Sequence, residues 1–425
     1  MRVLKLGSIG PAVQLLQLAL TRAGFGELSL DGIFGTGTDK ALRSFQRAQK
    51  LYADGIAGNA TQRQLMPYFT GFVSHTVSSG DTLFSIAQRY GSKSAAILTA
   101  NPGLDGDRLV PGAVITVPLP FDVVPTTISC FSALIAYCVR GLQARYPFIS
   151  VGEAGRSFMG KPLWTMRLGQ GENRVLYNAS HHANEWICTL LLLKFTEELA
   201  SAYAGGGLIY GQSAAEIFDY ASIFLLPAVN PDGMDLCTGE LQWGERYNFA
   251  LNISQQYPQY PFPGGWKANL QGIDLNLQYP AGWEQARENK FALGITSPAP
   301  GDYVGDRPLQ ASEVIALSDY TRLVDPALVL AYHTQGQVIY WQYLLYQVEG
   351  AEQIAGAFAE ASGYAAENTP YSSGFAGYKD WFIKNYLRPG FTIEAGKGKN
   401  PLPIEQFDKI YEDNLGILTL GALVT

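Results

Sequence analysis

Three short apolar runs constrain the fold of this chain more than any other feature. They lie at residues 174–177, 223–227 and 327–332 and suit strands that are buried on both faces. Amphipathic stretches with a helical period, such as residues 186–203, lie between them. Strands that alternate with helices predict an α/β domain over residues 124–425, with a mixed, largely parallel central sheet flanked by helices.

The length and composition indicate a folded protein with more than one domain. The chain has 425 residues, of which 47% are hydrophobic and 16% are charged, as in chains that form cores. The net charge of −7 gives no basic surface for nucleic acid. No apolar run reaches the roughly 20 residues that span a bilayer, so neither nucleic acid nor a membrane is an expected partner. The four cysteines form no C-x-x-C pattern and suit buried free thiols, although one disulfide remains open.

An internal repeat occupies the first part of the chain. An Asp-Gly-Ile-x-Gly box at residues 31–35 recurs at residues 54–58, and a helical apolar stretch follows each copy. Together with a helical pattern upstream, this predicts a small three-helix bundle over residues 1–70. Thr36 and Asn59 are the candidate caps of the second and third helices. Such a bundle does not by itself require a ligand.

Two resemblances give these N-terminal segments a function. The L-G-S-x-G-x-x-V-x-x-L-Q sequence at residues 6–17, with both Asp-Gly boxes, resembles the peptidoglycan-binding domain of wall hydrolases. Residues 73–119 predict a strand, two helices and a strand, with Asp81 or Thr82 as the first helix cap. Their V-x-x-G-D-T-L-x-x-I-A sequence and later Asn-Pro pair resemble a LysM domain, which implies binding to N-acetylglucosamine-containing glycan. A proline-rich stretch at residues 118–125 then predicts a short linker.

Histidine is the residue type that locates the chemistry. The chain has four histidines, and three of them, His181, His182 and His333, follow predicted buried strands. Ligands gather at the carboxyl ends of strands in open α/β sheets. Glu185 lies three residues after His182, so with His333 the site offers two nitrogens and one oxygen, a set typical of catalytic zinc. A single strand-end histidine is more often merely hydrogen-bonded, but two such sites in a histidine-poor chain favour a metal.

Ordered motifs in the C-terminal domain resemble the zinc carboxypeptidases of the carboxypeptidase A type. The motifs are H-x-x-E-W at 182–186, N-P-D-G at 230–233, G-I-D-L-N at 272–276, Y-H-T-Q-G-Q at 332–337 and F-T-I-E at 391–394. The resemblance implies one Zn²⁺ per chain, held by His182, Glu185 and His333. It also implies that Glu394 acts as general base towards the metal-activated water. His181 is expected to be structural or to orient a ligand.

The arginines of this family are missing. Its exopeptidases hold the C-terminal carboxylate of the substrate with an arginine that is Leu277 here, directly after the retained Asn276. Leucine cannot form a bidentate pair with a carboxylate, so ordinary carboxypeptidase activity is not expected. The arginine that usually precedes Gly272 is Gln271. Stabilisation of the oxyanion therefore falls to Gln271, Lys267 or the metal.

Two further positions bear on the substrate. Lys379 stands directly before Asp380, where the family carries the residue at the base of its leaving-side pocket. A cation there favours an acidic group after the scissile bond, such as the distal carboxylate of diaminopimelate, although a solvent-facing lysine is an equal alternative. Tyr371 resembles the mobile tyrosine that closes over the substrate.

The combination of modules resembles the γ-D-glutamyl-L-diamino acid endopeptidases of sporulating bacilli. The leading hypothesis is a zinc endopeptidase that hydrolyses the γ-D-glutamyl–meso-diaminopimelate bond in peptidoglycan stem peptides or muropeptides. One alternative is a metallocarboxypeptidase that trims ordinary peptides, and another is a non-catalytic wall-binding protein. The N-terminus shows no secretory signal pattern, so the expected location is cytoplasmic or associated with the spore or cell wall.

Overall fold

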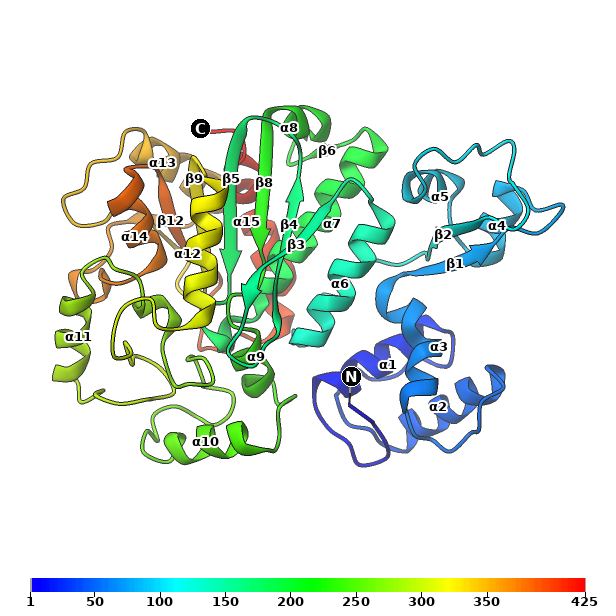
Figure 1. Ribbon diagram of the computed structural model, residues 1–425, viewed down its shortest axis with the longest axis horizontal. Coiled ribbons are helices and arrows are strands. Elements are labelled where there is room, and N and C mark those ends of the chain that lie inside the picture. The colour runs from blue at the N-terminus through cyan, green and yellow to red at the C-terminus, as the bar shows by residue number, and fades with distance from the viewer. Residues whose placement is uncertain (1, 425) are drawn as a thin grey trace. The chain divides into compact units, whose positions relative to one another are not determined.

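The computed structural model describes residues 2–424 and divides the chain into two compact units (Figure 1). Unit 1 contains Met1–Ile128 and Ala133–Ser150, and unit 2 contains Ser129–Ser132 and Val151–Thr425. Unit 1 therefore joins the two predicted N-terminal modules to the first helix of the predicted catalytic domain.

Unit 1 begins with three helices, as the sequence predicts. They are α1 (Pro11–Arg22), α2 (Thr36–Ala48) and α3 (Asn59–Thr70). Glycines occupy the cap position before each of them, and no side chain caps these helices. The prediction that Thr36 and Asn59 are caps is wrong by one residue, because each is already the first helical residue.

The two Asp-Gly boxes also have the same pattern of hydrogen bonds. Gln17 of α1 donates from Nε2 to Asp31 Oδ1 at 2.8 Å, and its Oε1 accepts from the backbone N–H of Gly32 at 3.0 Å. Gln46 of α2 binds the second box in the same way, with Nε2 at 2.9 Å from Asp54 Oδ1. Each buried glutamine therefore satisfies the polar groups of one tight turn.

The second segment of unit 1 has the predicted order of strand, two helices and strand. Its elements are β1 (Phe72–Thr76), α4 (Leu83–Tyr90), α5 (Ser94–Ala100) and β2 (Val114–Pro118), and β1 pairs with β2 in antiparallel register. Thr82 caps α4, since its side chain accepts from the N–H of Ser85 and the Ser85 hydroxyl accepts in return from Thr82. Asp81 instead binds the His75 ring at 2.9 Å.

The stretch at residues 118–125 is packed and not an exposed linker. It contacts helix α6 (Ser132–Arg145), and its two consecutive valines are at most 1% exposed. Arg145 donates hydrogen bonds to the carbonyls of Leu119 and Phe121, each at 2.9 Å. The proline-rich composition predicted a linker, but the apolar residues within it provide a buried anchor.

Unit 2 is built on an eight-stranded sheet. In spatial order it reads β11 (Ala365–Glu367), β10 (Val338–Tyr340), β12 (Gly390–Glu394), β9 (Leu328–His333), β5 (Asn173–Ala179), β8 (Ala221–Leu226), β4 (Pro162–Leu168) and β3 (Ser150–Arg156). The central pairs β12–β9, β9–β5 and β5–β8 are parallel, whereas β10–β12 and β4–β8 are antiparallel. The sheet is therefore mixed and largely parallel, and the three predicted apolar runs are its strands β5, β8 and β9.

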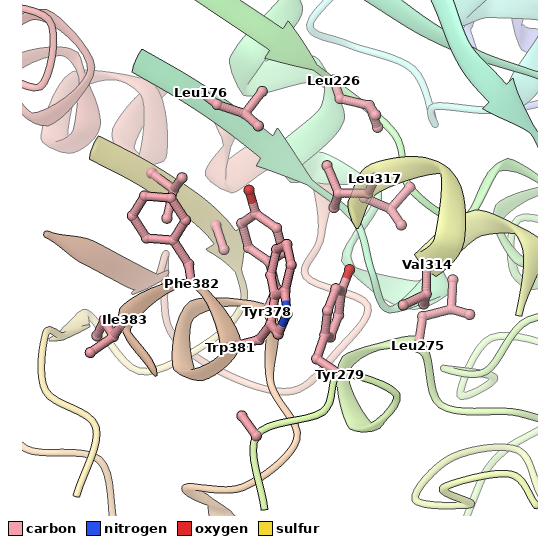
Figure 2. Packing of buried hydrophobic residues seen from close by; sticks show 14 of the residues in the cluster. Leu176, Leu226, Leu275, Tyr279, Val314, Leu317, Tyr378, Trp381, Phe382 and Ile383 are labelled. Atoms are coloured by element: carbon pink, nitrogen blue, oxygen red, sulfur yellow. The ribbon is translucent and has the colours of Figure 1, made fainter. Parts of the chain in front are cut away.

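Helices cover both faces of this sheet (Figure 1). The helices of unit 2 include α7 (Ile187–Gly205), α8 (Ala214–Tyr220), α9 (Pro231–Cys237), α10 (Glu245–Ser254), α11 (Trp283–Ala292), α12 (Ser312–Val324), α13 (Ala351–Ser362), α14 (Tyr378–Tyr386) and α15 (Phe407–Leu420), of which α10 and α11 lie below the sheet in the view of Figure 1. Leu176 of β5 packs with Leu317 of α12 and Phe382 of α14 in one buried cluster (Figure 2). The next residue, Tyr177, contacts Phe195 of α7 on the other face, as the alternation along a strand requires.

Two further predictions concern the chemistry of the chain as a whole. All four cysteines are buried thiols, as their spacing predicts. Among the helices of residues 2–424, none is long and apolar enough to cross a membrane.

Candidate active site

The carboxyl ends of three neighbouring strands bring the predicted ligands and base to one edge of the sheet. His333 is the last residue of β9 and Glu394 is the last residue of β12, and the two are partners in parallel register. His182 follows the end of β5 by three residues, and Glu185 ends the 3₁₀ turn η1 (Ala183–Glu185). Because parallel strands end together, residues separated by more than 200 positions in the sequence meet here.

The three predicted metal ligands converge on one point. One donor atom from each of His182, Glu185 and His333 lies within 4.8 Å of the others. The Glu185 carboxylate is 2.9 Å from His182 Nδ1 and 2.8 Å from His333 Nδ1, and the two Nδ1 atoms are 3.3 Å apart. Zinc bonds of about 2.0–2.1 Å at a tetrahedral angle place two imidazole nitrogens about 3.3 Å apart. The donor set therefore fits Zn²⁺ in chemistry and in spacing.

A buried carboxylate orients the first ligand. Asp274 lies before the 3₁₀ turn η2 (Leu275–Leu277), and its Oδ1 is 3.1 Å from His182 Nε2. When Nε2 donates to this carboxylate, Nδ1 is left with its lone pair towards the metal position. The sequence identified Asp274 only as part of the G-I-D-L-N motif and did not assign it a role. A histidine that binds a metal almost always donates its other ring N–H to a carboxylate, a carbonyl or water, so an aspartate in a neighbouring motif was the signal for this partner.

His181 belongs to the support of the site and not to its ligands. Its Nε2 lies 2.9 Å from the hydroxyl of Tyr279, and its ring stacks on the ring of His333 at 5.5 Å. Complete burial, reinforced by His333, holds the pKa of His181 well below its ordinary value, so the ring is neutral. This arrangement supports the expectation that His181 is structural.

The electrostatics of the site favour a positive charge at its centre. Burial opposes protonation of His182, but the charge of Glu185, assisted by Asp274, outweighs it and raises the pKa of His182 to about 10. Burial likewise opposes ionisation of Glu185, yet His182 and His333 hold the pKa of this carboxyl well below its ordinary value. Because Glu185 and Asp274 stabilise a positive charge on the His182 ring, they are also suited to stabilise a divalent cation at this site.

Glu394 has a different environment from the other carboxylates. Burial raises its pKa to about 7, and Glu185 adds to this rise while His333 opposes it. The side chain lines a pocket of about 190 Å³ that also contains His182. A carboxyl with a pKa near neutrality is able to accept and return a proton at physiological pH.

The pocket receives some of the predicted substrate-binding residues and not others. Asn276 and Lys379 are among its lining residues. Gln271 is not, and its backbone N–H and side chain both bond to Asn269. Tyr371 is 67% exposed and lines a separate, more apolar groove that adjoins the pocket at Thr369. Gln271, one of the predicted oxyanion donors, is therefore bonded to Asn269 and is not among the residues that line the pocket.

Lys379 is neither solvent-facing nor an available cation. It is 4% exposed, and its ammonium donates to Asp380 Oδ1 at 2.5 Å, to the carbonyl of Gln342 at 2.7 Å and to Thr369 Oγ1 at 3.1 Å. An ammonium has three donors, and all three are used. Asp380 compensates the charge, so the prediction of a positive pocket base needs this correction.

The position of the missing carboxylate anchor is apolar. Leu277 packs against a cluster that contains Trp283, Val304 and Phe375. The leucine side chain offers a free carboxylate neither a charge nor a hydrogen bond. The structure thus offers no substitute at residue 277 for the arginine that exopeptidases use.

The mixed sheet, with donor atoms that could hold a metal ion at its strand ends, is an arrangement typical of α/β metallohydrolases. The model of the zinc carboxypeptidase family matches residues 135–416, and the chain belongs to this family. Models of a peptidoglycan binding domain and a LysM domain match residues 9–65 and 75–118. The protein is therefore a zinc metallopeptidase that carries two N-terminal modules of wall-binding families.

Individual relatives agree with this assignment. The chain is 41% identical over 286 residues to gamma-D-glutamyl-L-diamino acid endopeptidase 1 of Lysinibacillus sphaericus, and this alignment covers 67% of this chain and 69% of that protein. It is 35% identical over 83 residues to a spore cortex-lytic enzyme of Oceanobacillus iheyensis, covering 19% of this chain and 30% of that enzyme. The crystal structure of carboxypeptidase A from Helicoverpa armigera shares the fold, with a TM-score of 0.51 and 16% identity over 84% of this chain and 98% of that one.

Proposed function

We propose that this protein hydrolyses peptidoglycan by cleaving the bond between γ-D-glutamate and a diamino acid, meso-diaminopimelate, in the stem peptide. The observation that carries the proposal is the complete His182, Glu185, His333 and Glu394 set beside a pocket whose carboxylate anchor is replaced by Leu277. The match to the endopeptidase of L. sphaericus and the two N-terminal modules support the same substrate.

The proposed mechanism assigns each residue one task. His182, Glu185 and His333 hold Zn²⁺, which, when bound, acidifies a water molecule and polarises the scissile carbonyl. Glu394 takes a proton from the attacking water and returns it to the nitrogen of the leaving amine. Burial, which raises the pKa of this carboxyl, favours both proton transfers near neutral pH.

Asn276 and Tyr371 remain the proposed substrate contacts outside the metal site. Asn276 uses its Oδ1 to accept from the backbone N–H of Tyr378 at 3.0 Å, which leaves its amide N–H₂ for the pocket. We propose that Tyr371, which is exposed beside the adjoining groove, covers the pocket entrance after a local movement. Lys379 and Asp380 together offer a neutral, dipolar wall, which suits the distal amino acid group of diaminopimelate better than a lone carboxylate.

Endopeptidase cleavage follows from the absence of a terminal anchor. A carboxypeptidase gains affinity and orientation from a bidentate arginine, and Leu277 cannot supply either. A substrate that continues beyond the diamino acid, for example into D-alanine, is therefore compatible with the site. The peptidoglycan-binding and LysM modules would hold the protein on the wall, the latter through N-acetylglucosamine-containing glycan, and we propose a wall or spore location.

The test is mass spectrometry of L-Ala-γ-D-Glu-meso-diaminopimelate-D-Ala after incubation with the purified protein. We expect release of L-Ala-D-Glu, loss of this activity with a chelator, and recovery with Zn²⁺. The lysine-containing tetrapeptide, tested in parallel, reports the choice of diamino acid. Release of D-Ala alone would establish a metallocarboxypeptidase instead, and intact substrate with one bound Zn²⁺ would favour a non-catalytic wall-binding protein.

A further inference from the structure

Three lysines line the pocket in the described part of the chain, and two of them are committed to aspartates. Lys290 contacts Asp302 Oδ1 at 2.5 Å, and Lys379 contacts Asp380 at the same distance. The third, Lys267, forms no side-chain hydrogen bond or ion pair with residues 2–424. Its ammonium is thus the one lysine charge of the pocket that is available to a ligand.

The backbone of Lys267 is fixed to the metal-binding segment. Its carbonyl accepts from the N–H of Ala183, between the ligands His182 and Glu185, at 2.9 Å. Its own N–H donates to the carbonyl of Pro300 at 2.8 Å. These bonds fix the backbone of Lys267 relative to the segment that carries His182 and Glu185, so its side chain lines the pocket from a rigid base.

The side chain is guided by its neighbours and remains charged. A Cβ atom on Gly301 would lie 3.3 Å from Lys267 Cδ, so the glycine leaves just enough room for the methylene chain. Burial opposes protonation of Lys267, but Asp274, Asp302, Glu185 and other carboxylates of the site outweigh it and raise the pKa. A protonated lysine without a close counterion is an electrostatic site for negative charge.

We propose that the Lys267 ammonium stabilises the negative charge that develops on the scissile carbonyl oxygen, in place of the arginine that this chain lacks. The inference rests on the proposed hydrolysis, and it makes Lys267 a catalytic residue that Gln271 cannot replace, since Gln271 lies outside the pocket lining.

The charge balance of the reaction agrees with this role. Water adds to the carbonyl carbon, its proton passes to Glu394, and the carbonyl oxygen becomes an anion. The carbonyl then re-forms, the C–N bond breaks, and Glu394 returns the proton to the amine nitrogen. Lys267 neither gains nor loses a proton, and its contribution is greatest while the oxygen is anionic, which lowers the barrier without tightening substrate binding.

The experiment compares Lys267→Met with Lys290→Met in zinc-loaded full-length protein. Both variants remove one pocket charge, but Lys290 is already paired with Asp302. We expect Lys267→Met to lower kcat on the tetrapeptide by about 10²–10³-fold with little change in KM, as for loss of an oxyanion donor. Lys290→Met should lower kcat much less, and Lys267→Arg should restore most of the lost rate. Lys267→Gln replaces Lys267→Met if the latter does not fold.

A second measurement is independent of the bond that the protein cleaves. Inorganic phosphate, a tetrahedral anion, is titrated calorimetrically into each zinc-loaded protein, and we expect about tenfold weaker binding to Lys267→Met at unchanged zinc content. Failure of the wild type to cleave the tetrapeptide would refute the proposed substrate while the phosphate titration still tests Lys267. Unchanged kcat and unchanged phosphate binding in Lys267→Met would overturn the inference. The inference would also be overturned if Lys267→Met raised KM without changing kcat, and if this effect disappeared with a substrate amidated at the D-Glu α-carboxyl. That result would show that Lys267 binds this carboxylate of the substrate.

Discussion

The environment of Glu394 links the stability of the metal-free protein to pH in a direction that can be tested. Burial raises its pKa to about 7 from an ordinary 4.5. Between these values the folded protein keeps a proton that the unfolded chain has lost, so the free energy of unfolding falls as pH rises through this window. The two pKa values differ by 7 − 4.5, about 2.5, which corresponds to about 3 kcal/mol at about 1.36 kcal/mol per unit.

Glu394→Gln removes this pH-dependent cost while keeping the shape of the side chain. Below pH 4.5 the carboxyl is protonated in both states, so the variant and the wild type should have similar stability. At pH 8 the metal-free variant should be more stable by up to about 3 kcal/mol. Denaturant unfolding of the chelated proteins at both pH values, followed by tryptophan fluorescence, measures this difference. A stability difference that is the same at both pH values would refute the reasoning about burial.

The same variant tests the catalytic role of Glu394. Because glutamine cannot accept a proton, kcat of the zinc-loaded variant should fall by at least about 10²-fold. Zinc content should stay at one per chain, since Glu394 is not among the converging donor atoms. Activity that survives the substitution would refute the proposed mechanism even if the stability prediction holds.

Three other predictions concern the metal, the pH profile and the packing of unit 1. Asp274→Ala should weaken Zn²⁺ binding by about 10–100-fold in a competition assay with a chelating dye, because His182 loses its orienting partner, and an unchanged affinity would exclude that role. In the zinc-loaded enzyme, kcat/KM should fall about tenfold per pH unit on the acid side of the Glu394 pKa, because a protonated Glu394 cannot act as a base. Bound Zn²⁺ lowers this pKa from the value of about 7 in the metal-free protein, so the fall should begin at or below pH 7. A kcat/KM that does not change with pH in this range would contradict the role of Glu394. Gly141→Ala should destabilise unit 1 by about 1–3 kcal/mol or more in thermal unfolding, because the added Cβ would lie 2.1 Å from the Thr70 carbonyl oxygen. Gly356→Ala serves as the control and should not destabilise the protein, because its Cβ would have no atom within 4 Å.

Local sequence patterns determined the parts of the protein that depend on periodicity and motif order. The buried strands β5, β8 and β9 were visible as apolar runs, because a strand covered on both faces has few polar positions. The ligands His182 and His333 were visible because each follows such a strand, and parallel strands end at one edge of a sheet. The N-terminal repeat was visible because each tight turn needs the same Asp-Gly chemistry.

The tertiary structure alone decided which partner each polar group meets. Sequence placed Lys379 in the pocket, but only packing shows that Asp380, Gln342 and Thr369 take all of its donors. Sequence left Gln271 and Lys267 open as oxyanion donors, and only the tertiary structure shows that Lys267 lines the pocket whereas Gln271 does not. The reason is physical: burial and secondary structure follow from the chain's own neighbours, whereas hydrogen-bond partners depend on segments that come together from distant positions in the sequence.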